Sequence, residues 1–134
     1  MKKNKQRIFN KKTGDCFRAC VSSLLGIENR DGLPHIDKPT WFSDWRKFLL
    51  PYGLALNFEA KACWRSGYWI ASVKSKNFPK GTHAIVMHSH KVWHDPSTHK
   101  RYRTGTSLLG KNLIVGGYFL EVVDPSKLGN LPPK

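Results

Sequence analysis

Apolar residues change their spacing once along this chain, and the order of the two patterns limits the folds that it can adopt. Up to residue 51 they recur every three or four positions, as on one face of a helix, whereas after residue 53 they form short runs rich in aliphatic and aromatic residues. Helices followed by strands are typical of α+β folds. Because 134 residues is about the size of one ordinary domain, the sequence predicts a single domain over residues 1–134, with N-terminal helices packed on a C-terminal antiparallel β-sheet.

Two helices are predicted in the first part of the chain. The first covers residues 16–25, whose apolar residues have helical spacing between Asp15 as an N-cap and Gly26 as a C-cap. The second begins after Thr40 and ends at Pro51, because proline cannot continue a helix. A stripe of apolar residues shares one face of this second helix, and we expect it to belong to the core rather than to a ligand site. The stripe consists of Trp41, Phe42, Trp45, Phe48 and Leu49.

Five strands are predicted in the second part, from runs of aliphatic, β-branched and aromatic residues. They cover residues 54–60, 68–73, 82–88, 92–95 and 117–123. The two ends of the chain have a different composition. Residues 1–9 form a basic lead-in, and residues 125–134 are expected to be a loose tail.

Positive charge is the strongest feature of the composition. Lysine and arginine number 23 against nine acidic residues, which gives a formal net charge of +14. Such a charge attracts nucleic acid, anionic wall polymers, membrane surfaces or an acidic protein, and it does not choose among them. Basic residues interleaved with Trp93 and Tyr102 surround the predicted hairpins, which suits either a nucleic-acid surface or a rim that attracts an acidic protein. These basic residues are Lys74, Lys76, Lys80, Lys91, Lys100, Arg101, Arg103 and Lys111.

The cysteines and the N-terminal residues bear on where the protein works. Three cysteines, an odd number without paired CxxC motifs, indicate neither a disulfide framework nor a structural zinc site. A reducing compartment, the cytoplasm, fits best. The basic residues 1–7 resemble the start of a signal peptide, but polar residues 10–12 follow where an apolar run is needed. No segment has the roughly 18 apolar residues needed to span a membrane, so we expect neither a cleaved signal nor a membrane span.

Cys16 is the candidate nucleophile. It stands where a loop becomes an apolar helix, in the stretch GDCFRAC over residues 14–20. A helix start supplies free backbone N–H groups and a partial positive charge, which favour the thiolate form of a cysteine. Cysteines in apolar helices are often only small buried residues. We expect this of Cys20, which has a lesser alternative as a resolving thiol, and we assign no role to Cys63.

His83 and Asp95 are candidates for the other two members of a catalytic triad. A thiolate nucleophile needs an imidazole as proton shuttle, and the imidazole needs a third group that fixes its orientation. His83 begins one predicted strand and Asp95 ends the next, with a turn at residues 89–91 between them. They share a face of the sheet if the numbers of paired residues add up to an even value, and they lie on opposite faces if the sum is odd. The sequence does not determine this register. Pro96 would stop the ladder and leave the carboxylate at a strand end.

A fourth group would stabilise the oxyanion of a tetrahedral intermediate. The backbone N–H of Cys16 and a side-chain amide together supply such a site. Asn10, six residues before the cysteine, is the candidate amide.

These residues resemble the pattern of papain-like cysteine peptidases, especially of the small peptidase domains that cut bacteriocin leaders in ABC transporters. Those domains carry Gln, four residues, Asp and Cys before an apolar helix, and later a His that leads a strand, with Asp-Pro about a dozen residues on. The matching positions here are Asn10, Asp15, Cys16, His83, Asp95 and Pro96. The segments GDCFRACVSSLLGIE, LPH and HDPS also look like those of small phage and bacterial proteins of this fold. The resemblance implies a papain-like fold, a Cys-His-Asp triad and an oxyanion role for Asn10.

Two positions depart from the family pattern. Asn10 stands in place of Gln, and its shorter side chain reaches about one methylene less far, which weakens the oxyanion site or leaves that role to Gln6. Phe17 replaces the small residue that commonly follows the nucleophile, and it is expected to narrow the cleft.

Three histidines near the predicted turn raise a metal hypothesis. His88 and His90 would share a strand face, and His94 lies across the turn. No acidic or cysteine ligand completes the set unless Asp95 is diverted to it. A solvated hairpin tip is therefore favoured, and neither a metal nor another cofactor is expected.

The leading hypothesis is a papain-like cysteine hydrolase that cleaves a peptide or isopeptide bond in a protein or peptide substrate, in a bacterial cytoplasm or, if the chain is phage-encoded, in the host cytoplasm. The alternative is a catalytically inactive binding protein of this fold, such as a phage factor, that holds nucleic acid or an acidic protein on its basic surface. A cell-wall amidase of the same fold is a third hypothesis.

Overall fold

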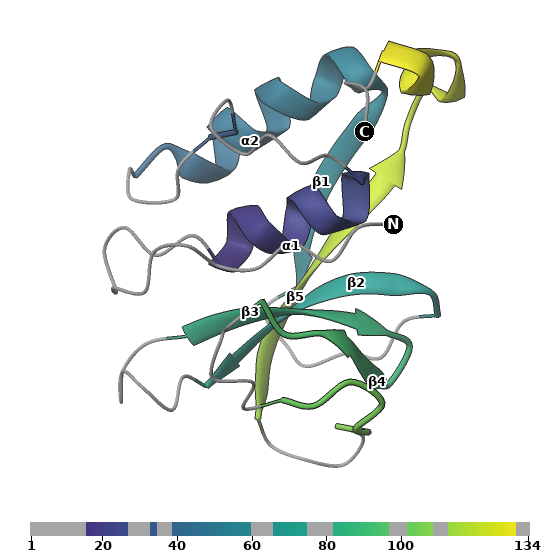
Figure 1. Cartoon of the computed structure of the whole chain (residues 1–134). Helices are drawn as coiled ribbons and strands as arrows, with labels where there is room; N and C mark the ends of the chain where they lie inside the picture. Colours follow the sequence, from purple (N-terminus) through teal and green to yellow (C-terminus); the bar gives the residue numbers. More distant parts are fainter. Residues whose placement is uncertain are drawn as a thin grey trace.

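The computed structural model describes seven segments of the chain (Figure 1). They are residues 16–26, 33–34, 39–59, 66–74, 82–96, 102–108 and 113–130. Two α-helices come first, α1 (Cys16–Leu25) and α2 (Trp41–Leu49). The short 3₁₀ helix η1 (Leu50–Tyr52) continues α2. α1 has the expected bounds. α2 begins where expected but ends at Leu49, and Pro51 lies within η1, which carries the helical turn past it.

Five strands and a second 3₁₀ helix complete the described chain. The strands are β1 (Leu54–Glu59), β2 (Tyr68–Lys74), β3 (Thr82–His88), β4 (Lys91–His94) and β5 (Ile114–Val122), and they are followed by η2 (Pro125–Asn130). The strands form one sheet in the order β1-β5-β2-β3-β4, and every neighbouring pair is antiparallel. The predicted α+β class, with two helices and an antiparallel sheet, is therefore confirmed.

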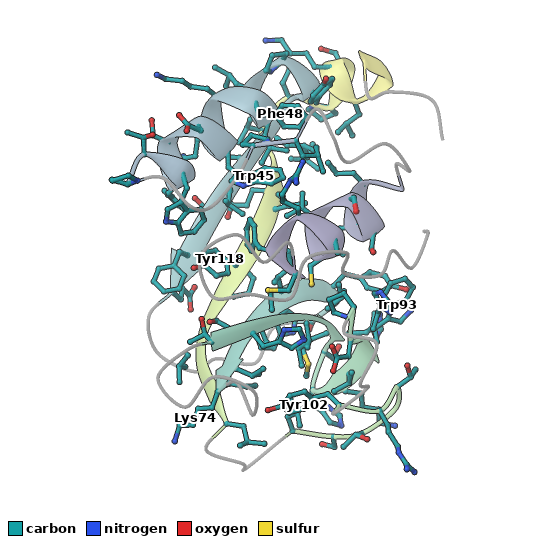
Figure 2. All side chains as sticks on the ribbon, turned by 60° about the vertical axis from the view of Figure 1, so that its left-hand side comes forward. Trp45, Phe48, Lys74, Trp93, Tyr102 and Tyr118 are labelled. Carbon is teal, nitrogen blue, oxygen red and sulfur yellow. The ribbon has the colours of Figure 1, made fainter. Side chains whose placement is uncertain are left out.

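One face of the sheet is covered by the two helices (Figure 1). Phe17 is at the centre of this layer. Its ring makes edge-to-face contacts with the rings of Trp41, Trp45 and Tyr118, at centroid distances of 5.6, 5.5 and 4.9 Å. These contacts join the two helices to β5, and each aromatic pair adds about 1 kcal/mol to the area that it buries. Trp45 and Leu49 of the aromatic stripe are buried in the core, as expected (Figure 2). Trp41, Phe42 and Phe48 are partly buried and pack against it.

A second core lies on the other face of the sheet. Trp69 and Phe119 stack there at 5.8 Å, and both are buried. Tyr102 and Leu108, from the connection after β4, cover this face. The sheet is thus buried on both sides, which explains why its central strands consist of almost continuous apolar runs rather than of alternating ones.

The β3–β4 hairpin contains the irregularity that decides how its side chains face. The turn consists of Ser89 and His90, so the first pair, His88 with Lys91, has an odd sum of residue numbers. A β-bulge follows, because Met87 pairs with Val92 whereas Val86 pairs with His94. Trp93 is the extra residue.

This bulge decides the register that the sequence left open. The two-residue turn alone would give an odd sum of paired numbers, which is the register that separates His83 from Asp95. Beyond Trp93 the sum of paired numbers becomes even, which assigns His83 and Asp95 to the same face of the sheet. The even register is thus produced by a bulge and not by the turn.

The end of the described chain also differs from expectation. Residues 125–130 were expected to belong to a loose tail, but Pro125–Asn130 form η2, which packs near η1. Leu128 packs against the helix-side core, and this apolar contact explains why the segment adopts a defined structure. Residues 131–134 and the basic lead-in 1–9 lie outside the described residues. No helix in the described part of the chain is long and apolar enough to cross a membrane.

Candidate active site

Cys16 is the first residue of α1 and is partly exposed. Its side chain lines a hollow of about 180 Å³, together with residues of α1, α2 and three strands. The other lining residues are Phe17, Trp41, Ser72, Thr82, Ala84 and Tyr118. The sulfur is therefore placed at a helix start and beside a space that a small part of a substrate can enter.

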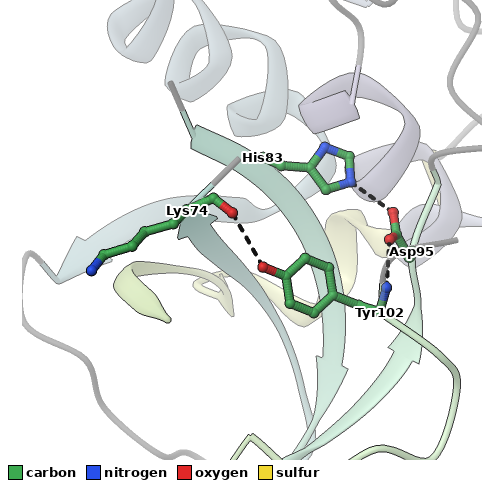
Figure 3. Close-up of polar contacts among 4 residues, drawn as sticks. All are labelled: Lys74, His83, Asp95 and Tyr102. Carbon is green, nitrogen blue, oxygen red and sulfur yellow. Dashed lines mark hydrogen bonds and ion pairs between the residues drawn. The ribbon is translucent and has the colours of Figure 1, made fainter. Parts of the chain in front are cut away.

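His83 and Asp95 form a close polar pair (Figure 3). His83 Nε2 donates a hydrogen bond to Asp95 Oδ1 at 2.6 Å. The Asp95 side chain is only 2% exposed and that of His83 is 15% exposed, so water screens the interaction weakly. His83 lies beyond the last β3–β4 pair, Val86 with His94. At this point β3 is no longer covered by the β4 ladder.

A backbone group fixes the second oxygen of Asp95. The N–H of Tyr102 donates to Asp95 Oδ2 at 3.2 Å, and the Tyr102 hydroxyl donates to the carbonyl oxygen of Lys74 at 3.1 Å (Figure 3). Tyr102, in the segment after β4, thus binds both the carboxylate, through its backbone N–H, and the last residue of β2, through its hydroxyl. This anchoring holds the carboxylate in one orientation toward the imidazole.

The pKa of His83 reflects these neighbours. Burial lowers it, but hydrogen bonds with Asp95 and with Cys16, together with the negative charges of both, outweigh burial and raise the pKa from 6.5 to about 9. The imidazole is therefore charged at neutral pH. Since Nε2 is engaged by Asp95, Nδ1 is the ring nitrogen left to face the sulfur.

The imidazole of His83 thus lies between a carboxylate that it contacts and a cysteine that raises its pKa. An imidazolium beside a sulfur stabilises a thiolate, and it also holds the proton that a leaving group needs. A buried carboxylate fixes the tautomer and orientation of the ring. The arrangement has the parts of nucleophilic catalysis by a cysteine.

Cys20 differs from Cys16 although both lie on the same helix. It is fully buried among core residues. Burial raises the pKa of the Cys20 thiol well above its usual value, and the nearby Cys16 and Asp95 raise it further. Cys20 is therefore a core thiol, as expected from its position one turn after Cys16.

Sequence reasoning missed the part played by Tyr102. Its ring was expected on a basic surface, either a base-stacking one or a solvated rim, but the side chain is 6% exposed and packs in the second core. That expectation is wrong for Tyr102, because the ring is needed to bury the far face of the sheet. Its contact with Asp95 uses a backbone N–H, which every residue except proline carries, so no sequence signal could have revealed it.

Several predicted residues lie outside the part of the chain that the structure describes. They are Asn10, Gln6, Asp15 and Cys63. The predicted oxyanion amide therefore has no structural account. The backbone N–H of Cys16, as the first residue of α1, has no partner within the helix.

The histidines near the turn are spread over different environments. His88 is exposed, with its ring 4.6 Å from that of Tyr68, whereas His94 is buried. Among the described residues, no group of three or more His, Cys, Asp or Glu side chains is placed to hold a metal ion.

The predicted basic surface is described only in part. Lys74, Lys91 and Arg103 are exposed, and they lie on β2, on β4 and after β4. The remaining residues of that predicted surface are outside the described segments. They are Lys76, Lys80, Lys100, Arg101 and Lys111.

The chain was also compared with known proteins. No family model matches it, and neither a curated protein nor a solved structure does.

Proposed function

We propose that this protein is a papain-like cysteine hydrolase that cleaves a peptide or isopeptide bond through Cys16, His83 and Asp95. The observation that carries the proposal is the 2.6 Å contact between His83 and the buried Asp95. Cys16 lies near enough to the same imidazole to raise its pKa. The α+β fold supports it, since a helix that begins with the cysteine packs on a strand that carries the histidine.

The proposed reaction has two steps. The Cys16 thiolate attacks the carbonyl carbon, and the C–N bond breaks as His83 gives its proton to the departing amine, which leaves a thioester on the sulfur. Water then attacks the thioester while His83 takes its proton. The C–S bond breaks, the acid product departs, and the thiolate and imidazolium are restored. Asp95 holds the ring throughout.

Selective alkylation of Cys16 tests the nucleophile. We expect iodoacetamide at neutral pH to modify Cys16 and not the buried Cys20, with the site of modification read by mass spectrometry of peptides. The variant His83→Ala is expected to slow the modification strongly, because the imidazolium that stabilises the thiolate is gone. His88→Gln is the matched control, since His88 is an exposed histidine of the same hairpin without contact to Cys16 in the described structure.

Hydrolysis is tested with the same variants. General acid–base catalysis contributes about 100- to 10,000-fold to a rate, so His83→Ala and Asp95→Asn are expected to lower hydrolysis of a generic peptide with an amide-linked fluorophore by factors in this range. Equal reactivity of Cys16 in the native protein, His83→Ala and His88→Gln would show that the three groups do not act together, and the proposal would fail.

The competing proposal is a binding protein of this fold that uses its positive charge. The net charge of +14 favours it. An unreactive Cys16, together with tight and salt-sensitive binding of nucleic acid, would select this alternative over the hydrolase.

A further inference from the structure

A second hollow opens next to the one that Cys16 lines. Its volume is about 450 Å³, and it lies between α2, β1 and β5. It is lined by Trp41, Phe42, Arg46, Asn57, Phe58 and Tyr118. Trp41 and Tyr118 also line the Cys16 hollow, so the two spaces share a wall. We call the larger one the aromatic hollow.

The walls of the aromatic hollow are rings that hold one another in place. Tyr118 contacts Phe58 at 4.8 Å and Trp41 at 5.8 Å between ring centroids, and Trp41 contacts Phe42 at 5.6 Å. Phe58 remains 45% exposed. An exposed aromatic surface of this kind favours an apolar side chain over water.

Gly116 gives Phe58 its position. A Cβ atom at residue 116 would come within 2.7 Å of Cε2 of Phe58. The glycine therefore allows the ring to lie against β5. A larger residue here would push the ring of Phe58 away, which would change the shape of the hollow.

Arg46 is the one charged residue among the described residues that line the aromatic hollow. Its guanidinium lies over the ring of Phe42, with Cζ 5.9 Å from the ring centroid. Arg46 is exposed, and within the described part of the chain it forms no ion pair. A guanidinium held on an aromatic wall is well placed to receive a carboxylate.

We propose that the aromatic hollow binds an apolar side chain of a peptide substrate, with a carboxylate on the neighbouring residue paired with Arg46. The inference rests on the proposed function, because the wall shared with the Cys16 hollow places this side chain near the bond that the sulfur attacks. The substrate class is a peptide segment with adjacent large apolar and acidic residues. The net charge of +14 also attracts an acidic peptide.

A nucleic acid fits the aromatic hollow less well. Binding of a single strand needs a series of cations that follow the phosphates, beside rings that present open faces. The hollow has one arginine, and three of its rings pack edge-on against each other. A single apolar side chain can contact the aromatic rings, and one neighbouring carboxylate can pair with Arg46.

Peptide binding to the Cys16→Ala variant tests the inference without requiring catalysis. We would measure fluorescence anisotropy of labelled hexapeptides that carry Phe-Glu, Glu-Phe, Ser-Glu or Phe-Lys at the centre. We expect at least one of the two peptides with Phe beside Glu to bind ten times more tightly than those with Ser-Glu or Phe-Lys. Arg46→Glu is expected to reverse the preference, so that Phe-Lys binds best.

Lys47→Glu is the matched control, because it makes the same change in charge at the next residue, which does not line the aromatic hollow. It is expected to leave the preference for Phe beside Glu in place. Three outcomes would each overturn the inference. They are equal effects of the two charge reversals on peptide binding, no preference among the peptides, and displacement of the peptide by an equimolar oligonucleotide. Gly116→Ala, which acts on Phe58, is expected to weaken the preference for Phe over Ser.

Protection of Cys16 links the hollow to the site. In the native protein, the preferred peptide is expected to slow alkylation of Cys16 at least fivefold. A peptide that binds without slowing the alkylation of Cys16 would show that the aromatic hollow does not place the peptide beside the nucleophile. A Cys16 that is unreactive in the free protein would instead contradict the proposed hydrolase, while the anisotropy measurement would still decide the peptide preference.

Discussion

Asp95 is held from two sides, and this determines the orientation of the imidazole beside it. One carboxylate oxygen accepts from His83 and the other from the backbone N–H of Tyr102. A carboxylate with both oxygens engaged cannot rotate without breaking a hydrogen bond in a nearly dry environment. The ring of His83 is therefore kept in one position by the carboxylate.

The raised pKa of His83 links this pair to stability. The folded protein holds the proton with a pKa of about 9, against an ordinary value of 6.5, so protonation stabilises the fold. This contribution is complete below pH 6.5 and is lost as the pH rises through about 9. Its size is about 3 kcal/mol.

The free energy of unfolding is expected to fall between about pH 6.5 and 9 more steeply in the native protein than in His83→Gln. Urea unfolding at a series of pH values measures how the free energy of unfolding depends on pH in each protein. Subtracting the two curves cancels the contribution of all other titrating groups. Parallel curves would show that the His83 proton is not held more tightly in the folded state.

At the scale of elements, the bulge at Trp93 decides whether the site can form. An unbroken ladder from the His88–Lys91 pair would place Asp95 opposite Ala84, on the other face from His83. The extra residue shifts every later position of β4 by one. Asp95 thereby comes to the face of His83.

Deletions in β4 test this role. Deletion of Trp93 alone is expected to keep the raised pKa of His83, because the ladder then becomes regular with the same partners on both sides of the deleted residue. Deletion of Val92 and Trp93 together is expected to bring this pKa down, because Asp95 then pairs with Val86 and faces away. NMR titration of the His83 ring measures its pKa in both variants. A raised pKa after the double deletion would show that the register of β4 does not control the contact between His83 and Asp95.

The turn that joins η1 to β1 depends on Gly53. Its φ of 73° is in the left-handed region, and its carbonyl oxygen accepts hydrogen bonds from the N–H groups of Val123 and Asp124. A Cβ atom here would lie 2.0 Å from the carbonyl oxygen of Asp124. The turn and the end of β5 therefore fit together only around glycine.

Gly53→Ala is expected to lower the free energy of unfolding by more than about 2 kcal/mol, from the left-handed backbone and the clash together. Gly67 is the matched control, because its φ is 80° but nothing lies within 4 Å of a Cβ atom there. Gly67→Ala is expected to cost about 1 kcal/mol. Urea unfolding measures the free energy of unfolding of both variants. Equal decreases would show that the close approach to Asp124 does not contribute to the cost of Gly53→Ala.

For the whole molecule, the helix layer brings two residues of the candidate site together, whereas the positive charge is spread over the surface. The helix layer places the cysteine of α1 against the strand that carries His83. The exposed cations of the described chain are instead spread over several elements, and they gather on no single one. They are Arg46, Lys47, Lys74, Lys91, Arg103 and Lys127.

Duplex DNA is expected to bind weakly and without sequence preference, with a dissociation constant of about 10⁻⁴ to 10⁻⁶ M at physiological salt. The affinity is expected to fall at least tenfold between about 50 and 200 mM salt and to be unchanged in Cys16→Ala. Anisotropy of a labelled duplex measures this. Nanomolar binding at physiological salt would favour the binding protein over the hydrolase.

Much of the fold could be predicted from the sequence, because its signals are local. The bounds of α1 and of β3 follow from apolar spacing and flanking turn residues, and the structure has them where expected. The start of β5 was missed by three residues, because Gly116 and Gly117 have low strand propensity. Cβ atoms at these two positions would press on the rings of Phe58 and Trp69, so packing overrides propensity there.

The sequence by itself determined that a cysteine begins an apolar helix and that a histidine and an aspartate flank a hairpin. The tertiary structure decided whether those groups meet. Side chains of a strand alternate between two faces, so one extra residue, Trp93, changes the face of Asp95. The anchoring of Asp95 by the backbone of Tyr102, and the wall that the two hollows share, arise from contacts between distant segments, which no local pattern of residues encodes.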